Sequence, residues 1–160
     1  MVCKKMRKLR QLVLVISITS SGLAGFGALP AGSTITKSAA QVQFVKDYSA
    51  LHKKVMTFAD AVDRINNYSS DASINKIVNP VYDGFLKFQN QLLSQSWPKN
   101  SQSDIKHLRN TIDPINGLLN SLVFAAHQSQ VEWASSFAIS FTTFGSAVRA
   151  VEKDLGLKIT

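Results

Sequence analysis

The chain has 160 residues, of which 45% are hydrophobic and 18% are charged, and these fractions exclude a disordered or fibrous protein. Five of the 18 basic residues precede residue 11, and the other 13 face 10 acidic residues. So small an excess argues against a strong phosphate-binding surface, and we expect no nucleic acid partner.

The first 27 residues predict a secretory signal peptide. The five cations lead into an apolar run over residues 12–18, and mostly small residues follow as far as Gly27. Cleavage is expected after Gly27, or as late as Ala40, because small residues occupy the last and third-last positions before both points. Residues 28–40 then form a flexible lead-in that contains Gly, Pro, Ser and Thr.

This leader predicts a secreted or extracytoplasmic protein with no stable membrane insertion after cleavage. The alternative is a chain tethered to the membrane by an uncleaved N-terminal segment, because residues 12–29 are just long enough to span a bilayer. Cys3 is the only cysteine and lies ahead of the apolar run. The mature chain therefore has no thiol for a disulfide, a thiolate metal site or a covalent haem link, and packing must stabilise it.

Residues 41–157 predict four amphipathic helices. In the first, the apolar residues from Phe44 to Ile65 are spaced alternately by four and three positions, which places them on one stripe. Similar stripes run over residues 74–92, 105–126 and 133–151. Because the links are short, neighbouring helices should be antiparallel. The predicted fold is all-α, an antiparallel up-down-up-down four-helix bundle preceded by the signal peptide.

Capping residues predict where three helix ends lie. The Ser101 hydroxyl should accept a hydrogen bond from an early N–H of the third helix. Ser129 and Glu132 have the spacing of a capping box at the start of the fourth helix, and Gly156 should close its end. The link before Ser129 contains neither Gly nor Pro, so one long bent helix is the alternative to separate third and fourth helices.

Two prolines interrupt the stripes. Pro80 in the second helix and Pro114 in the third each remove an N–H and should bend their helices. The bends either curve the helices around the core or open a pocket between them. The candidate ligand-binding residues of such a pocket are Phe85, Ile115, Phe137 and Phe141, since aromatic side chains often line apolar pockets.

Metal and cofactor sites are not expected. Bundles that hold two iron or manganese ions use Glu and Glu-x-x-His, but neither Glu132 nor Glu152, the only glutamates, is followed by His at that spacing. Haem would need His or Met inside the core, whereas His52, His107 and His127 fall at the surface or boundary of the stripes. We predict no metal site and no cofactor.

Catalysis is not expected either. The serines lie in caps and turns, and the chain has no Gly-x-Ser-x-Gly motif. Asp60 and Asp63 share a helical face, but the nearby Arg64 indicates a solvated surface. We therefore predict that the protein is not an enzyme and has no catalytic residue.

The expected function is a non-catalytic binding or interaction module that presents helical surfaces to an envelope or extracellular protein partner. The alternative is a carrier of an apolar ligand or haem in the pocket between bent helices. The two hypotheses differ in whether the centre of the bundle is filled or hollow.

A short set of motifs carries a family resemblance. Trp97-Pro98 separates the second and third helices, Trp133 lies early in the fourth, and Asp-Leu-Gly-Leu occupies residues 154–157. With its leader and four helices, the chain resembles a loose set of uncharacterised exported helical proteins of high-GC Gram-positive bacteria, over residues 40–158. The resemblance implies a bacterial envelope or secreted location and supplies no catalytic residue. Many members look lipid-anchored, whereas this chain has no cysteine after its leader.

Overall fold

The computed structural model describes residues 38–128 and 130–157, and all regular secondary structure in these two ranges is helical. The predicted signal peptide and residues 28–37 of the lead-in lie outside them. The elements are α2 (Ala39–Val62), α3 (Asp71–Ser94), the short 3₁₀ helix η2 (Lys99–Ser101), α4 (Gln102–Asn110), α5 (Ile112–His127) and α6 (Gln130–Asp154).

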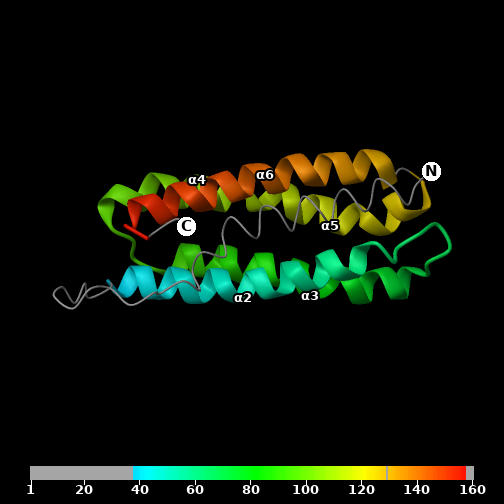
Figure 1. Cartoon of the computed structure of the whole chain (residues 1–160), viewed down its shortest axis with the longest axis horizontal. Helices are drawn as coiled ribbons and strands as arrows, with labels where there is room; N and C mark the ends of the chain where they lie inside the picture. Colours follow the sequence, from blue (N-terminus) through cyan, green and yellow to red (C-terminus); the bar gives the residue numbers. More distant parts are fainter. Residues whose placement is uncertain (1–37, 129, 158–160) are drawn as a thin grey trace, which may run out of the picture.

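The helices form two layers of antiparallel helices (Figure 1). One layer holds α2 and α3, and the other holds α6 beside α4 and α5, which follow each other end to end. Helix α3 packs on α5 across the layers, and both α4 and α5 pack on α6. The predicted third and fourth helices are therefore separate, and the all-α four-helix bundle is confirmed, with α4 and α5 together as its third helix.

The third helix is divided at Thr111, three residues before Pro114. Proline has no N–H to donate to the carbonyl four residues earlier, and its ring crowds that carbonyl. The chain therefore ends α4 at Asn110 and begins α5 at Ile112, so Pro114 lies in a first turn, where an N–H has no helical partner. The N–H and the hydroxyl of Thr111 both donate to the Leu108 carbonyl, at 3.1 and 2.7 Å. By contrast, α3 continues unbroken through its interior proline.

Helix α2 begins two residues before the predicted start of the bundle. The Ser38 hydroxyl accepts from the Gln41 N–H at 3.2 Å, and the Gln41 side chain accepts from the Ser38 N–H at 2.7 Å. This reciprocal capping box satisfies two donors of the first turn. Residues 39 and 40, expected in the flexible lead-in, therefore belong to the helix.

Serines behave differently at the other helix starts. At α3, the Ser70 hydroxyl accepts from the Ser73 N–H at 3.3 Å. The expectation for Ser101 is wrong, because η2 precedes α4 and already holds Ser101 in a helical conformation. Its hydroxyl donates to the Pro98 carbonyl at 3.0 Å instead. Ser129, the expected cap of α6, lies outside the described residues.

The end of α6 closes as predicted at Gly156, whose φ of +65° favours a residue without Cβ. The Leu157 N–H donates to the Glu152 carbonyl at 2.8 Å, and the Gly156 N–H donates to the Lys153 carbonyl at 3.0 Å. These two bonds define a Schellman motif. Leu157 folds back and is buried, so the polar and apolar parts of the motif are both present.

The predicted stripes meet in one core along the bundle. Leu51, Phe88, Leu119 and Phe144, one from each predicted helix, are at most 2% exposed. Aromatic rings link the layers, as where Phe144 lies 6.4 Å from Phe88 with the two rings nearly perpendicular. Such edge contacts add to the stabilisation that burial supplies. Among the helices described, none combines the length and the apolarity that crossing a bilayer requires.

Candidate functional site

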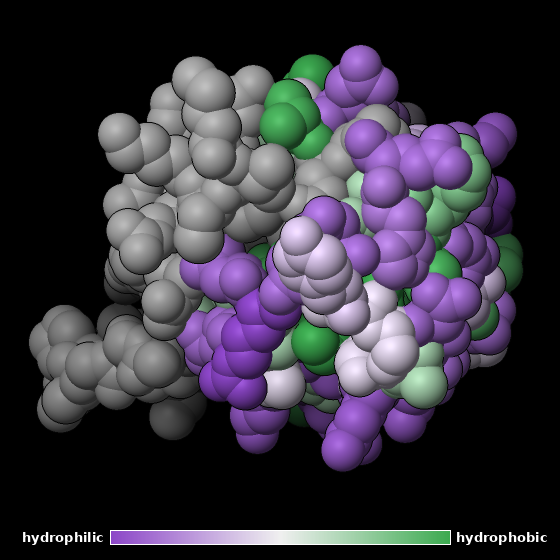
Figure 2. Space-filling model, turned by 90° about the vertical axis from the view of Figure 1, so that its right-hand side faces the viewer, coloured by the Kyte–Doolittle hydropathy of each residue, from purple (hydrophilic) through white to green (hydrophobic). Residues whose placement is uncertain are grey.

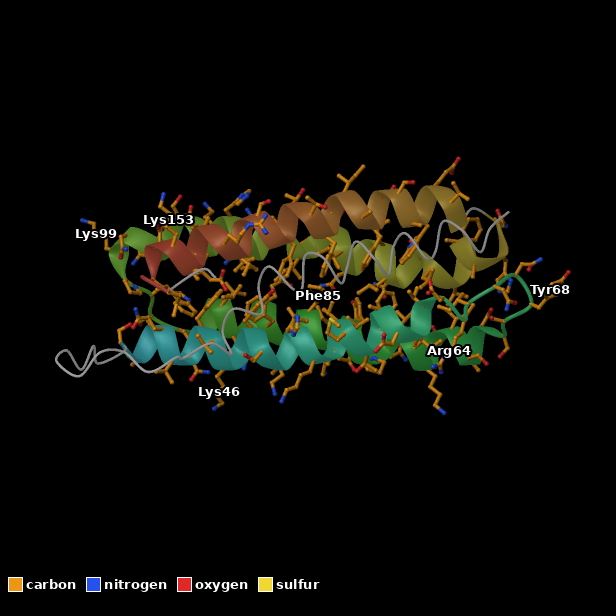
Figure 3. All side chains as sticks on the ribbon, viewed as in Figure 1. Lys46, Arg64, Tyr68, Phe85, Lys99 and Lys153 are labelled. Atoms are coloured by element: carbon orange, nitrogen blue, oxygen red, sulfur yellow. The ribbon has the colours of Figure 1, made fainter. Side chains whose placement is uncertain are left out.

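The four candidate ligand-binding residues lie in the core, and each is at most 4% exposed. Phe85 of α3 projects between the two layers (Figure 3). Its ring lies 5.4 Å from Phe144, which in turn lies 5.9 Å from Phe141, and Phe137 stacks on Phe141 at 5.9 Å. The three aromatic candidates thus belong to one row of rings, in which Phe144 links Phe85 to Phe141 and Phe141 links Phe144 to Phe137. Ile115 is buried on α5, and the ligand-binding role of these residues stays a prediction.

The histidines lie where the stripes predicted them. His107 and His127 are exposed, and His52 is half-buried. Within the described ranges, no group of three or more His, Cys, Asp or Glu side chains is placed to share a metal ion.

Asp47 on α2 is a buried carboxylate that the sequence analysis did not identify, with 4% exposure. Gln43, one turn earlier, donates to both carboxylate oxygens at 2.9 Å. Gln91 of α3 and Gln95, the residue that follows this helix, each donate to one oxygen at 2.8 Å. The amides supply as many hydrogen bonds as a carboxylate commonly accepts, so we interpret this cluster as a structural connection between α2 and α3.

Glu152 is a second buried carboxyl group, near the end of α6, and it is also 4% exposed. Burial raises the pKa of Glu152 from 4.5 to about 7, against the opposing effect of the Arg149 charge one turn earlier. At the same end of the bundle, the Gln41 amide donates to the Leu155 carbonyl and so joins the start of α2 to the end of α6. Glu152 lies four residues after Val148, one turn further along the same face of α6, and this spacing is a signal that the sequence did contain.

The loop between α2 and α3 is held by its own polar groups. The Asn66 carbonyl accepts from the Ser69 N–H at 3.0 Å, and the Asn66 side chain accepts from the Tyr68 N–H at 2.9 Å. The Ser69 hydroxyl accepts from the Asn66 N–H at 3.1 Å. Asn side chains commonly bond the backbone two residues on in such turns. The turn directs Tyr68 outward, and this residue is 90% exposed (Figure 3).

His127, the last residue of α5, connects this loop to the other layer. Its Nδ1 lies 3.2 Å from the carbonyl oxygen of Asn67, and its Nε2 lies 3.1 Å from Oδ1 of Asp71, the first residue of α3. The ring therefore joins the loop, the start of α3 and the end of α5. We call the surface formed by Tyr68, Asn67, Asp71, Phe124 and His127 the Tyr68 end.

The Tyr68 end carries exposed aromatic rings on a polar background. Phe124 lies one turn before His127 and is exposed, as is Tyr68. Figure 2 shows this end of the molecule as mostly hydrophilic, with small separate hydrophobic areas. Exposed aromatic side chains of this kind are enriched among the residues that dominate protein binding.

Tyr68 is not among the candidate residues predicted from the sequence. The run Asn-Asn-Tyr-Ser-Ser has the composition of a turn, and this local signal was sufficient to predict an ordered loop. No local signal joins His127 to Asp71, because the two residues are 56 positions apart. Their contact depends on how α5 is aligned against α3.

Comparisons with protein-family models, with curated proteins and with solved structures find no match for this chain. Its function must therefore be inferred from its own residues. The Tyr68 end combines an exposed aromatic residue with a loop that is held by hydrogen bonds.

Proposed function

We propose that this protein is a non-catalytic interaction module that binds a protein partner through the Tyr68 end. The observation that carries the proposal is the exposure of Tyr68 on a loop held by hydrogen bonds. A partner pocket that encloses the ring would bury a large apolar area, and tyrosine loses little side-chain freedom on binding. Because the loop is already ordered, its backbone also loses little entropy.

The neighbours of Tyr68 supply the polar surroundings that a binding surface needs. Arg64 extends from the same end of the bundle (Figure 3). His127 and Asp71 add a ring N–H and a carboxylate beside the loop. A central aromatic residue with a polar rim is the usual arrangement of a protein interface.

The proposal is tested with the full-length tagged protein and the envelope fraction of its own host. We expect the wild-type protein to capture a partner, and Tyr68→Ser to reduce its recovery at least about tenfold. Ile139→Ser is the matched control, because Ile139 is 70% exposed but lies on α6, outside the Tyr68 end. Circular dichroism checks that both variants are folded. Equal capture by Tyr68→Ser and wild type, or no partner for a strictly monomeric protein, would overturn the proposal.

We propose that the same molecule works outside the cytoplasm, in the cell envelope or secreted. The basic and apolar start of the chain supports this location. Cleavage after Gly27 would leave the Ser38–Gln41 capping box intact, whereas cleavage after Ala40 would remove Ser38. N-terminal sequencing of the exported chain should therefore begin at Ala28, and an exported chain that keeps Met1 would contradict cleavage.

A further inference from the structure

Basic side chains gather at the end of the bundle opposite the Tyr68 end. Lys99 and Lys153 project from this end, beside α6 (Figure 3). Arg149 lies one turn before Lys153 on the same helix, and Lys106 lies on α4, which packs on α6. The three lysines are exposed, and Arg149 is half-buried. We call the surface formed by these four residues the basic end.

One hydrogen bond fixes how these side chains are aligned along the bundle axis. The Asn100 side chain donates to the Asp154 carbonyl at 2.8 Å, so Lys99 and Lys153, which precede these two residues, are neighbours. Helices α4 and α6 are antiparallel, so Lys106 lies at about the same position along the axis as Arg149 (Figure 1). The four cations therefore lie within about two helical turns of one another.

The acidic residues nearby do not neutralise the basic end. In η2, α4 and the last two turns of α6, Asp104 and Asp154 are half-buried and Glu152 is buried, so none of the three is exposed. No carboxylate in residues 38–128 and 130–157 forms an ion pair with any of the four cations. The elements that meet at the Tyr68 end carry three exposed carboxylates against two exposed cations: Asp60, Asp71 and Glu132 against Arg64 and Lys76. The fold thus separates charge along the bundle, although the sequence has only a small positive excess.

The start of α2 lies at the basic end as well (Figure 1). The Gln41 amide joins it there to the Leu155 carbonyl after α6. The predicted apolar segment, residues 12–29, is connected to Ser38 by residues 30–37, which span at most about 30 Å. A leader that is held in a membrane therefore keeps the basic end, and not the Tyr68 end, close to the bilayer surface.

We propose that the basic end binds the surface of a lipid bilayer that contains anionic phospholipids. Phosphate headgroups attract lysine and arginine side chains that lie near such a surface, and the attraction grows with the number of cations. The bundle then stands on the membrane with the Tyr68 end about 37 Å away, because α6 has 25 residues with a rise of 1.5 Å each. The membrane contact does not depend on the Tyr68 end, which faces away from the bilayer in this orientation.

Sedimentation with lipid vesicles tests the proposal on the chain as its host exports it. We expect binding to vesicles of equimolar phosphatidylcholine and phosphatidylglycerol, and little binding to phosphatidylcholine alone. The double variant Lys99→Gln, Lys153→Gln should bind the anionic vesicles at least about tenfold more weakly, because each lysine near the surface contributes about fivefold. Binding of the wild-type chain should also weaken as salt is added.

The matched control is the double variant Lys53→Gln, Lys76→Gln, which removes the same charge from two exposed lysines outside the basic end. It should bind the anionic vesicles within about twofold of wild type, and circular dichroism checks that both double variants are folded. Equal weakening by the two variants, or equal binding to neutral and anionic vesicles, would overturn the proposal. Binding to soluble polyphosphate without binding to anionic vesicles would identify a soluble polyanion as the ligand and would overturn it too.

Tryptophan fluorescence tests the orientation of the bundle on the membrane. Trp97 lies two residues before Lys99, whereas Trp133 lies at the other end of α6. On anionic vesicles with nitroxide-labelled headgroups, Trp97 in the Trp133→Phe variant should be quenched more strongly than Trp133 in the Trp97→Phe variant. Equal quenching would contradict the proposed orientation.

The membrane proposal and the proposed function fail separately. If the basic end binds anionic vesicles as expected but Tyr68→Ser captures the envelope partner normally, the proposed function fails and the membrane contact stands. If capture depends on Tyr68 but the wild-type chain does not bind anionic vesicles, the membrane contact alone fails.

Discussion

Asp47 and Glu152 are carboxyl side chains with the same 4% exposure, but the fold surrounds them differently. Asp47 receives hydrogen bonds from the amides of three glutamines. For Glu152 the main effect of the surroundings is burial, which opposes ionisation. A buried charge without sufficient hydrogen bonds lowers stability, so the stability of the protein should depend on the protonation of Glu152.

Glu152 should make the protein less stable as the pH rises. The pKa of Glu152 is about 7 in the folded chain and near 4.5 when the chain is unfolded. Between these values the folded state holds a proton that the unfolded state releases, so the free energy of unfolding falls with increasing pH until about pH 7. The expected loss is on the order of 3 kcal/mol. Glu152→Gln should remove this loss, so it should stabilise the protein at pH 8 and have little effect near pH 4.5.

Urea denaturation at a series of pH values measures this difference. The matched control is Glu132→Gln, since Glu132 is the other glutamate and is exposed in the first turn of α6. Its replacement should leave the pH dependence of stability unchanged. A Glu152→Gln variant whose stability follows the wild-type pH profile would contradict the assignment.

At the scale of helices, two glycines show how close the packing is. Gly84 of α3 is buried, and a Cβ placed there would lie 2.7 Å from Lys54 Cδ and 3.3 Å from Leu51 Cδ1 of α2. Gly117 of α5 is exposed, and a Cβ there would meet nothing within 4 Å. A methyl group at position 84 would therefore crowd two side chains of α2, whereas one at position 117 would meet open space.

Alanine at these two positions should have different effects. Gly117→Ala should raise the free energy of unfolding by about 0.5–1 kcal/mol, because alanine favours a helix interior over glycine. Gly84→Ala gains the same helix propensity but displaces the Lys54 side chain, so it should stabilise less or destabilise. Urea denaturation of both variants measures the difference. Equal stabilisation by both substitutions would show that the α2–α3 contact has room for a methyl group.

Local signals predicted the helices better than their interruptions. The stripe spacing and the Gly156 stop located the helical segments, because both depend on residues within a few turns of each other. Pro114 indicated a bend, but its position did not reveal that the helix divides completely at Thr111, whose N–H and hydroxyl both bond back to Leu108. The η2 turn likewise changed the role of Ser101 from acceptor to donor.

At the scale of the whole molecule, the two tryptophans report on opposite ends of one core. Trp97 donates to the Leu92 carbonyl at 2.8 Å and meets Phe44 edge-on at 6.1 Å. Trp133, early in α6, stacks on Phe137 at 4.9 Å. Buried side chains continue between them without a break, so the bundle should unfold as one unit.

This cooperativity is measured with the single-tryptophan variants Trp97→Phe and Trp133→Phe. In each variant, the urea midpoint from fluorescence of the remaining tryptophan should agree with the midpoint from circular dichroism. The midpoints of the two variants can differ from each other, because each loses a different contact. A fluorescence midpoint that departs from the dichroism midpoint would show that one end of the bundle unfolds separately.

The amino-acid sequence by itself determined that the chain forms antiparallel amphipathic helices, which residues face the core and how the last helix ends. These properties follow from spacings of three and four residues and from the φ angle that one glycine permits. Only the tertiary structure decided that His127 meets Asp71, that three glutamines surround Asp47 and that Tyr68 projects from an ordered loop. Such contacts depend on how each helix is shifted along the bundle axis and rotated about its own axis. Many residues that are far apart in the chain together determine these shifts and rotations.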